Sequence, residues 1–316
     1  MTKLPISILI PTMNRPESLK HTLESYIDSD YVPSQIVIVD QTQDELIRKN
    51  VKDIVSNFSR FTSISYFFLE KPSSTVSRNI ATSLATEEII VYSDDDVEVY
   101  SDTLYNVYQT MQDNSVSMIA GLDESMVNSS SGIGYLTGTK SFFKRKKGHV
   151  TSSVLGRFPN KSYGRVETEW AMGFFFVVRK SLLDRWNILW DEKMQGYAYA
   201  EDLDFSFGYY KRSKEEKLCC IICDNIKVKH LVSREYRAPS KRVTNSYIVN
   251  RLYISYKHKL GIASRIAIDW CDFWQLVRRI ITKESPRDLV YARKMAHKLR
   301  KLIRLGDLSF LDELND

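Results

Sequence analysis

Short apolar runs alternate with amphipathic segments over the first 120 residues. Pro16 stands where the first turn of a helix tolerates proline, and Leu19, Leu23 and Tyr26 follow it at helical spacing. The same spacing predicts further helices at residues 46–58, 76–85 and 102–112. The apolar runs between them predict strands at residues 6–10, 35–39, 63–69, 89–92 and 116–120, the last ended by Gly121. Strands that alternate with helices form right-handed crossovers, so this half predicts a Rossmann-like α/β fold with a mostly parallel sheet covered on both faces.

The pattern changes after this half. Residues 122–169 are rich in Ser, Gly and Lys with weak periodicity, which in a compact domain is typical of a functional loop or lid. Regular spacing then returns and predicts an apolar segment at 170–179, helices at 181–186 and 201–211, and strands at 218–223 and 226–230. From about residue 240 the pattern is helical to the end.

Length and composition are those of a folded α/β protein. The chain has 316 residues, of which 43% are hydrophobic and 27% charged, enough for one large domain with an appendage. The longest apolar uncharged stretch, residues 170–178, is about half of what a membrane span needs. The apolar run near the N-terminus is too short for a signal peptide. A cytoplasmic protein is therefore expected.

Four cysteines also suit a reducing compartment. Cys220 and Cys223 form a C-x-x-C pair inside an apolar run, without a second pair that would complete a zinc site. We therefore interpret them as core thiols of a strand.

Three adjacent carboxylates follow the strand at 89–92. In an open α/β sheet, ligands bind beyond the carboxyl ends of the strands, where Asp94, Asp95 and Asp96 fall. If the backbone stays extended, Asp94 and Asp96 point the same way and Asp95 the opposite way. Burying several carboxylates requires a compensating cation, and oxygen ligands suit Mg²⁺ or Mn²⁺. A solvated acidic turn is the alternative interpretation.

A second acidic group opens the helix at 201–211. Glu201 and Asp202 follow an aromatic, glycine-containing segment at residues 196–200. Favourable interaction with the helix dipole is one explanation, and a general base for an acceptor hydroxyl is the other. His230 ends the last predicted strand, where it is either structural or a further metal ligand.

Six motifs in this order resemble the family 2 glycosyltransferases of GT-A fold, across about residues 5–232. They are residues 8–15 (ILIPTMNR), 38–40 (IVD), 77–79 (SRN), 94–96 (DDD), 201–202 (ED) and His230. Each motif alone is weak, but all six occur in order, each at the expected place. The resemblance implies a GT-A catalytic domain over 1–232, with a nucleotide-binding half at 1–121 and an acceptor-side half at 122–232, followed by a helical C-terminal extension over 233–316.

The resemblance also implies a role for each matching position. Asp202 would be the catalytic base, with Glu201 holding it or an acceptor hydroxyl. Asp96 and His230 would bind the metal. Gly121 and residues 170–176 would shape the sugar and acceptor sites. The nucleotide-sugar site would be lined by Pro11, Thr12, Asn14 and Arg15, with Asp40 at the base and Arg78 at the base or diphosphate. Asp94 would contact the ribose or lie in the second coordination shell of the metal, and Asp95 would belong to the same site.

These roles describe an inverting transfer. A nucleoside diphosphate would leave with Mn²⁺ or Mg²⁺ stabilising its charge, while the carboxylate base deprotonates the attacking hydroxyl. We expect hexosyl or N-acetylhexosaminyl transfer from a donor of UDP type to a glycan or lipid-linked acceptor, in bacterial surface glycan or polysaccharide synthesis. No Q-x-x-R-W element follows Asp202 and no membrane helix is expected, so one sugar per encounter is favoured over processive synthesis.

Other classes fit less well. A nucleotidyltransferase-like enzyme would carry a glycine-rich loop where this chain has PTMNR at 11–15, and a dehydrogenase would need G-x-G-x-x-G after the first strand. A non-catalytic membrane-peripheral or nucleic-acid-binding protein would leave both carboxylate groups unexplained. We therefore expect no nucleic-acid partner.

The net charge of +6 comes from one C-terminal segment. Residues 286–305 carry seven Lys/Arg against Asp288 alone, an excess that equals the net charge of the whole chain. Two apolar stripes run through this region: Ile266, Trp270, Phe273, Trp274, Val277 and Ile281, and then Leu289, Ala292, Ala296, Leu299 and Ile303. We expect these faces to pack on the catalytic domain or on a second subunit in a homodimer. Attachment to an anionic surface on the inner face of the membrane is the alternative.

Overall fold

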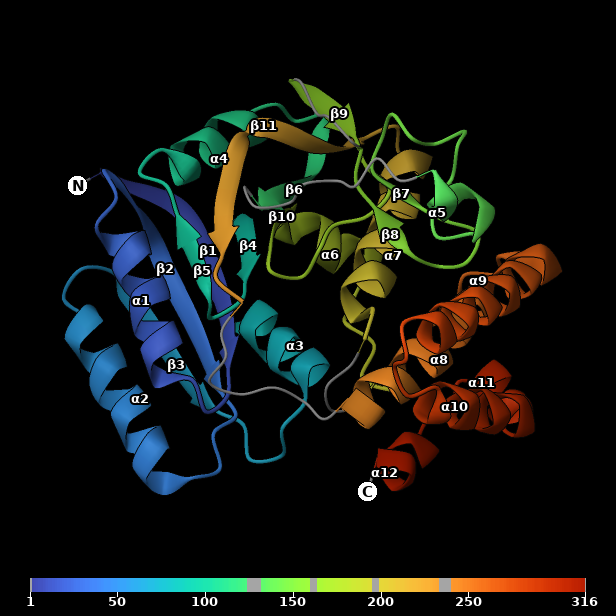
Figure 1. Cartoon of the computed structure of the whole chain (residues 1–316). Helices are drawn as coiled ribbons and strands as arrows, with labels where there is room; N and C mark the ends of the chain where they lie inside the picture. Colours follow the sequence, from blue (N-terminus) through green and yellow to red (C-terminus); the bar gives the residue numbers. More distant parts are fainter. Residues whose placement is uncertain (1, 124–131, 160–163, 195–198, 233–239, 316) are drawn as a thin grey trace.

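A mixed sheet forms the centre of the molecule in this computed structural model, which describes residues 2–123, 132–159, 164–194, 199–232 and 240–315 (Figure 1). Within those residues the sheet has nine strands in the order β3-β2-β1-β4-β10-β6-β11-β5, with β9 paired to β11. The strands are β1 (Thr2–Thr12), β2 (Tyr31–Asp40), β3 (Ser63–Phe68), β4 (Ile89–Ser93), β5 (Val97–Val99), β6 (Val116–Asp123), β9 (Arg165–Glu167), β10 (Phe175–Arg179) and β11 (Cys219–His230).

Among the described residues the sheet has as many antiparallel as parallel pairings, and the longest pairing, that of β1 with β2, is parallel. β1 pairs in parallel with β2 and β4, β2 with β3, and β6 with β11. β10 lies antiparallel between β4 and β6, and the short strands β5 and β9 are antiparallel to β11. A separate two-stranded sheet joins β7 (His149–Val150) to β8 (Gly156–Arg157). Because the longest pairings are parallel, the predicted α/β class with a mostly parallel sheet is confirmed.

Helices cover both faces of the sheet, and more of them follow it. They are α1 (Pro16–Ile27), α2 (Glu45–Phe58), α3 (Ser74–Leu84), α4 (Thr103–Met111), α5 (Ile133–Leu136), α6 (Lys180–Trp186), α7 (Glu201–Glu215), α8 (Ser240–Lys257), α9 (Gly261–Ile281), α10 (Arg287–Lys298), α11 (Arg300–Leu305) and α12 (Phe310–Asn315). Figure 1 shows α8–α12 gathered on one side of the molecule, away from α1 and α2. No described helix combines the length and the hydropathy that a membrane span requires.

Successive strand residues feed two separate cores, one on each face of the sheet. In β1, Ile8 and Ile10 pack with α1, α2 and α4, while Leu9 packs with α3, α6 and α7. Alternation of this kind follows from the two-residue period of a strand. It also explains the C-x-x-C pair, since Cys220 lies in one core and Cys223 in the other. Their prediction as core thiols is confirmed, and burial raises the pKa of each thiol to about 11.

Two predictions about strands were wrong. β6 does not stop at Gly121 but continues to Asp123, because Leu122 and Asp123 pair in parallel with β11. The missing side chain of Gly121 leaves room for Phe175 of β10. A Cβ atom at this position would lie 2.6 Å from Cδ1 of Phe175. The two strands expected at 218–223 and 226–230 are one strand, β11, with a register shift between Ile222 and Lys227.

The two C-terminal stripes behave differently. Leu289, Ala292, Ala296 and Ile303 are buried, as predicted for a face that packs inward. In α9 the buried residues are Ser264, Ile268, Cys271 and Asp272 instead of the predicted stripe. Of the predicted stripe, Ile266, Trp270, Phe273 and Ile281 are exposed, so the stripe does not pack into the core of the catalytic domain, although Trp270 donates a hydrogen bond to the carbonyl of Leu136. Packing on a second subunit stays a prediction.

Candidate active site

The acidic triplet lies at the carboxyl end of β4, beside the end of β1. Strand pairing explains how His230 reaches it. β5 follows the triplet directly and pairs antiparallel with the end of β11, so that His230 lies opposite Val97, the residue after Asp96. Residues 134 positions apart are thereby brought together, as a ligand site at the end of an open sheet requires.

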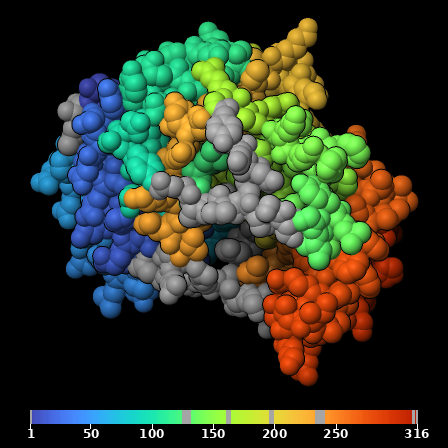
Figure 2. All heavy atoms as spheres, turned by 45° about the horizontal axis from the view of Figure 1, so that its top comes forward, coloured from blue at the N-terminus to red at the C-terminus, as the bar shows by residue number. Residues whose placement is uncertain are grey.

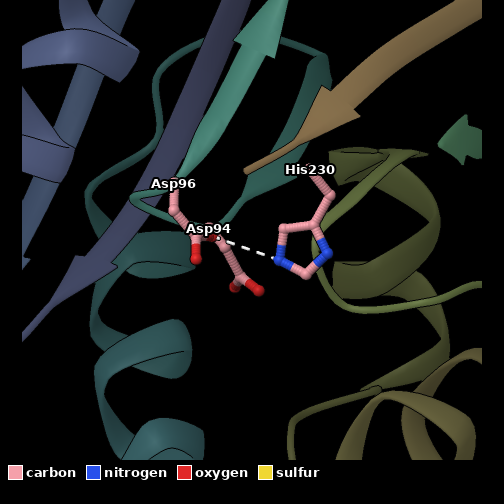
Figure 3. A group of neighbouring side chains, drawn as sticks. All are labelled: Asp94, Asp96 and His230. Atoms are coloured by element: carbon pink, nitrogen blue, oxygen red, sulfur yellow. Dashed lines mark ion pairs between the residues drawn. The ribbon is translucent and has the colours of Figure 1, made fainter. Parts of the chain in front are cut away.

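Asp94, Asp96 and His230 point toward one another (Figure 3). Each offers a ligand atom, and these atoms all lie within 4.8 Å of one another. Nε2 of His230 lies 3.2 Å from Oδ1 of Asp96, and its ring stacks on Phe174 at 5.0 Å. Burial lowers the pKa of His230, but the hydrogen bond and charge of Asp96 outweigh it and the net shift is upward.

This donor set fits a divalent cation. Burial raises the pKa of Asp94, an effect that Arg78 opposes and Asp96 reinforces. Two carboxylates and an imidazole in one cluster supply hard oxygen donors and one nitrogen, a combination that suits Mn²⁺ or Mg²⁺. A bound cation would offset the unfavourable burial of these carboxylates.

The side chain of Asp95 points toward the end of β1. Its Oδ2 accepts a hydrogen bond from Oγ1 of Thr12 at 2.7 Å, and its Oδ1 lies 3.1 Å from Nη1 of Arg15. Burial raises the pKa of Asp95 to about 7, although Arg15 opposes the shift. Arg15 also lies 3.5 Å from Oδ2 of Asp96. The extended backbone on which the predicted alternation depended does not occur, since Asp95 and Asp96 lie in a turn and Arg15 contacts both of them. These contacts join the loop after β1 to the loop after β4.

The neighbouring loops are tied together by short polar contacts. Asn14 adopts a left-handed backbone conformation with φ of 57°, and its N–H donates to Oγ1 of Thr42 at 2.9 Å. Asp40 is fully buried at the end of β2 and accepts hydrogen bonds from the N–H of Thr42 and the hydroxyl of Tyr66. Pro11 lies within β1. Contact of these residues with a nucleotide stays a prediction.

Arg78 connects the two acidic groups. Its Nη2 lies 3.0 Å from Oδ1 of Asp94, and its Nη1 lies 3.5 Å from Oε1 of Glu201. The guanidinium also stacks over Trp190 at 4.7 Å, and the side chain is only 7% exposed. One buried arginine therefore touches both carboxylate groups, so the triplet and the Glu-Asp pair border the same site.

Asp202 is held by two backbone donors at the start of α7. Its Oδ2 accepts from the N–H of Gly173 at 2.8 Å, and its Oδ1 accepts from the N–H of Leu203 at 2.7 Å. Burial raises the pKa values of both Glu201 and Asp202, with Arg78 opposing the shift in each case. Residues 196–198 of the preceding aromatic segment lie outside the described residues.

Several contacts at this site were missed by the sequence analysis. Asp123 lies beside the end of β11, where its Oδ1 is 3.5 Å from the backbone nitrogen of His230. It was overlooked because β6 was expected to stop at Gly121. Trp190 carries no motif that would have indicated its place under Arg78. Gly173 could have been noticed as the glycine inside an otherwise apolar segment.

Asp204 lies in the same turn of α7 as Glu201 and Asp202. It is buried between Lys257 and His258 at the end of α8, with Oδ1 2.8 Å from Nε2 of His258. The ion pair with Lys257 adds a second link. The C-terminal helices thus hold the turn that carries Glu201 and Asp202.

Comparison with known proteins gives one family and several similar structures. The profile described as "Glycosyl transferase family 2" matches residues 7–186. The sequence matches no curated protein.

Three solved structures illustrate the similarity of fold. The mannosyltransferase PcManGT from Pyrobaculum calidifontis, in complex with GDP-Man and Mn²⁺, has a TM-score of 0.57 at 15% identity, covering 98% of this chain and 85% of that one. S. aureus TarS 1–349 has a TM-score of 0.53 at 16% identity, covering 100% and 90%. GalNAc-T7 with UDP, GalNAc and Mn²⁺ has a TM-score of 0.57 at 14% identity, covering 88% and 58%.

Proposed function

We propose that the protein transfers one sugar from a nucleoside-diphosphate sugar to an acceptor hydroxyl, with inversion at the anomeric carbon. The proposal starts from the family, because the chain belongs to glycosyl transferase family 2 and has the GT-A fold. Its donor class, a nucleotide sugar, follows from the family. The main observation in support of this reaction is the position of Arg78, which contacts both Asp94 and Glu201. Groups suited to the donor diphosphate and groups suited to the acceptor hydroxyl therefore share one site.

The donor end is assigned to the loops after β1, β2 and β4. We assign Thr12, Asn14 and Arg15 to the nucleotide, with Asp40 near the base. Asp94, Asp96 and His230 would hold Mn²⁺ or Mg²⁺, which when bound neutralises negative charge on the departing diphosphate. The complexes of two structural neighbours with Mn²⁺ and GDP-Man or UDP support this assignment. Arg78 would add a positive charge beside the same phosphates.

The acceptor end is assigned to the start of α7. Asp202 would take the proton of the acceptor hydroxyl while its oxygen attacks C1 from the face opposite the diphosphate. The bond from C1 to the diphosphate oxygen breaks as the new bond forms, so the anomeric configuration inverts. The N–H groups of Gly173 and Leu203 hold the carboxylate in one orientation. General-base catalysis of this kind contributes about 10²–10⁴ in rate.

The proposed reaction includes a choice of donor and of acceptor. We favour hexosyl or N-acetylhexosaminyl transfer from a UDP-type donor, one sugar per encounter, to a glycan or lipid-linked acceptor in bacterial surface glycan synthesis. Incubating the protein with a panel of nucleotide sugars and Mn²⁺ would identify the donor from the release of nucleoside diphosphate. Formation of pyrophosphate from a nucleoside triphosphate and a sugar phosphate would instead indicate a nucleotidyltransferase.

The donor site can be tested by thermal melting. We expect UDP or GDP with Mn²⁺ to stabilise the protein by about 2.7 kcal/mol at a ligand concentration one hundred times Kd. Asp96→Ala removes a ligand of the cation and should abolish the Mn²⁺-dependent part of this stabilisation. Asp184→Ala, at an exposed carboxylate of α6 paired with Lys180, is the matched control and should melt like the wild type with ligand. Equal stabilisation of both variants would refute the assignment of Asp96.

A further inference from the structure

Helix α9 presents a continuous apolar stripe to solvent. From Ile262 to Phe273 its members recur every three or four residues, and Ile280 follows two turns later on the same face of the helix. Ile262, Ile266 and Ile281 are 68%, 62% and 75% exposed. The exposed members of the stripe are Ile262, Ile266, Trp270, Phe273, Ile280 and Ile281. The stripe runs along the whole helix, which spans 21 residues.

The opposite face of α9 is firmly attached to the protein. Ile268 and Cys271 are buried there, and Asp272 forms a buried ion pair with Arg251 of α8 at 2.7 Å. This ion pair fixes the rotation of the helix about its axis. The outward direction of the stripe is therefore set by specific contacts on the other side.

The segment around α5 extends the apolar surface. Nε1 of Trp270 donates a hydrogen bond to the carbonyl of Leu136 at 2.8 Å, which joins α5 to the middle of α9. Ile133 and Leu136 are exposed beside this contact, and Phe143 is 96% exposed. Figure 2 shows the green surface of this segment lying against the orange surface of the C-terminal helices. Large apolar patches on soluble proteins mark sites of interaction.

The charge around this surface is positive. Residues 132–147 contain five Lys/Arg and no Asp or Glu. Lys144 and Lys147 pair with Glu169, whereas Arg145 and Lys146 are exposed, with Arg145 stacked over Phe142 at 3.9 Å. In a symmetric dimer built on this face, both copies would bring the same positive charge to the interface. A surface of opposite charge is the better complement.

We propose that α9 and the α5 segment form a docking surface for an anionic lipid bilayer. The apolar stripe would lie in the boundary between headgroups and acyl chains, with the helix parallel to the membrane plane. Arg145, Lys146 and their neighbours would contact the anionic headgroups, an attraction that salt weakens. This proposal does not rest on the reaction proposed above, since it concerns a surface that contains none of the site residues.

Co-sedimentation with vesicles tests the proposal. The full-length protein should sediment with vesicles of phosphatidylcholine and phosphatidylglycerol at low salt, and far less with phosphatidylcholine alone or at high salt. Ile266→Asn combined with Phe273→Asn should lower the partition coefficient about tenfold or more, because two exposed apolar anchors are lost. Leu46→Asn combined with Leu189→Asn makes the same change at exposed residues outside this surface and should sediment like the wild type.

A second variant tests the charge separately from the apolar stripe. Arg145→Glu combined with Lys146→Glu should also lower the partition coefficient about tenfold or more and remove its salt dependence. Melting temperatures equal to that of the wild type would show that each variant is folded. The proposal would be overturned if the wild-type protein did not sediment with anionic vesicles, or if the stripe variant sedimented with them like the wild type. So would a lipid-free dimer of the wild type that the stripe variant abolishes, since the face would then belong to a second copy.

Discussion

Neighbouring carboxylates of the triplet have different surroundings and therefore different chemistry. Asp94 and Asp96 face His230, whereas Asp95 accepts a hydrogen bond from Thr12 and pairs with Arg15. Arg78 touches Asp94 from the side of Glu201. Substituting Asp95 would thus disturb the attachment of two loops, while substituting Asp96 would remove a direct ligand of the cation.

Asp202→Asn should separate catalysis from donor binding. The amide cannot accept a proton, so we expect kcat to fall by about 10²-fold or more. The affinity for UDP with Mn²⁺ should change little, because Asp202 is not part of the cation cluster. Steady-state kinetics and titration calorimetry measure the two quantities. Glu215→Gln, the same chemical change at the exposed end of α7, is the control. Near-normal turnover of Asp202→Asn would remove this residue from the mechanism.

The pH dependence of the reaction should report the environment of Asp202. Burial raises its pKa, and only the unprotonated carboxylate can accept the proton of the acceptor. Activity is thus fully present above the raised pKa and is lost as pH falls through it. We expect kcat/KM to begin falling above pH 3.9, the ordinary pKa of aspartate. A profile that stays flat down to about pH 4 would contradict this assignment.

Gly121 shows how two strands set the position of the triplet. It lies in β6 against Phe175 of β10, and the preceding carbonyl, that of Phe174, accepts a hydrogen bond from the N–H of Asp94 at 2.9 Å. A side chain at Gly121 would push β10 away from β6. The contact between the two strands is therefore connected to the geometry of the cation cluster.

Gly121→Ala should destabilise the protein by about 1–3 kcal/mol, because the added Cβ atom would lie 2.7 Å from the carbonyl oxygen of Phe175. Urea denaturation measures the change, and the affinity for Mn²⁺ with UDP should weaken as well. Gly132→Ala is the matched control, since no atom lies within 4 Å of the Cβ it would add. If both variants lose the same stability, close packing of β6 on β10 is not the cause.

The C-terminal helices are joined to the rest of the molecule by buried charge. Arg251 of α8 is fully buried, pairs with Asp272 of α9, and donates two hydrogen bonds to the carbonyl of Ser153. Asp204 of α7 makes a second junction with Lys257 and His258. Helices late in the chain therefore position both the start of α7 and the exposed stripe.

Arg251→Met should cost about 3–5 kcal/mol of unfolding free energy, because Asp272 would keep a buried charge with only Arg293 beside it. Lys180→Met removes an exposed ion pair with Asp184 and should cost less than about 1 kcal/mol. Chemical denaturation of both variants measures the difference. Combining Arg251→Met with Asp272→Leu should recover part of the loss, and no recovery would argue against the buried charge as its cause.

Much of the architecture could be predicted because its signals are local. Short apolar runs predicted β1, β2, β3 and β4, and Pro16 marked the start of α1. The resemblance to family 2 glycosyltransferases is what assigned the triplet and the Glu-Asp pair to a single site. The prediction that Asp95 faces away from Asp94 and Asp96 assumed an extended backbone, whereas Asp95 and Asp96 lie in a turn.

The errors concern contacts between residues far apart in the chain. Gly121 was expected to end a strand, because nothing local indicates that Leu122 and Asp123 will pair with β11. In α9 the more apolar face was expected to be buried. Periodicity measures how apolar a face is, but Arg251, a separate residue of α8, decides which face turns inward.

The sequence by itself determined the strands and helices, the fold class and the groups able to perform chemistry, since these depend on residues close along the chain. Only the tertiary structure decided that Arg78 joins Asp94 to Glu201, that β5 pairs with β11 to bring His230 beside Asp96, and that the stripe of α9 faces solvent. These outcomes depend on strand order, on the rotation of a helix and on the pairing of buried charges. Strand order, helix rotation and charge pairing each depend on the packing of the whole chain, so a local sequence pattern does not predict them.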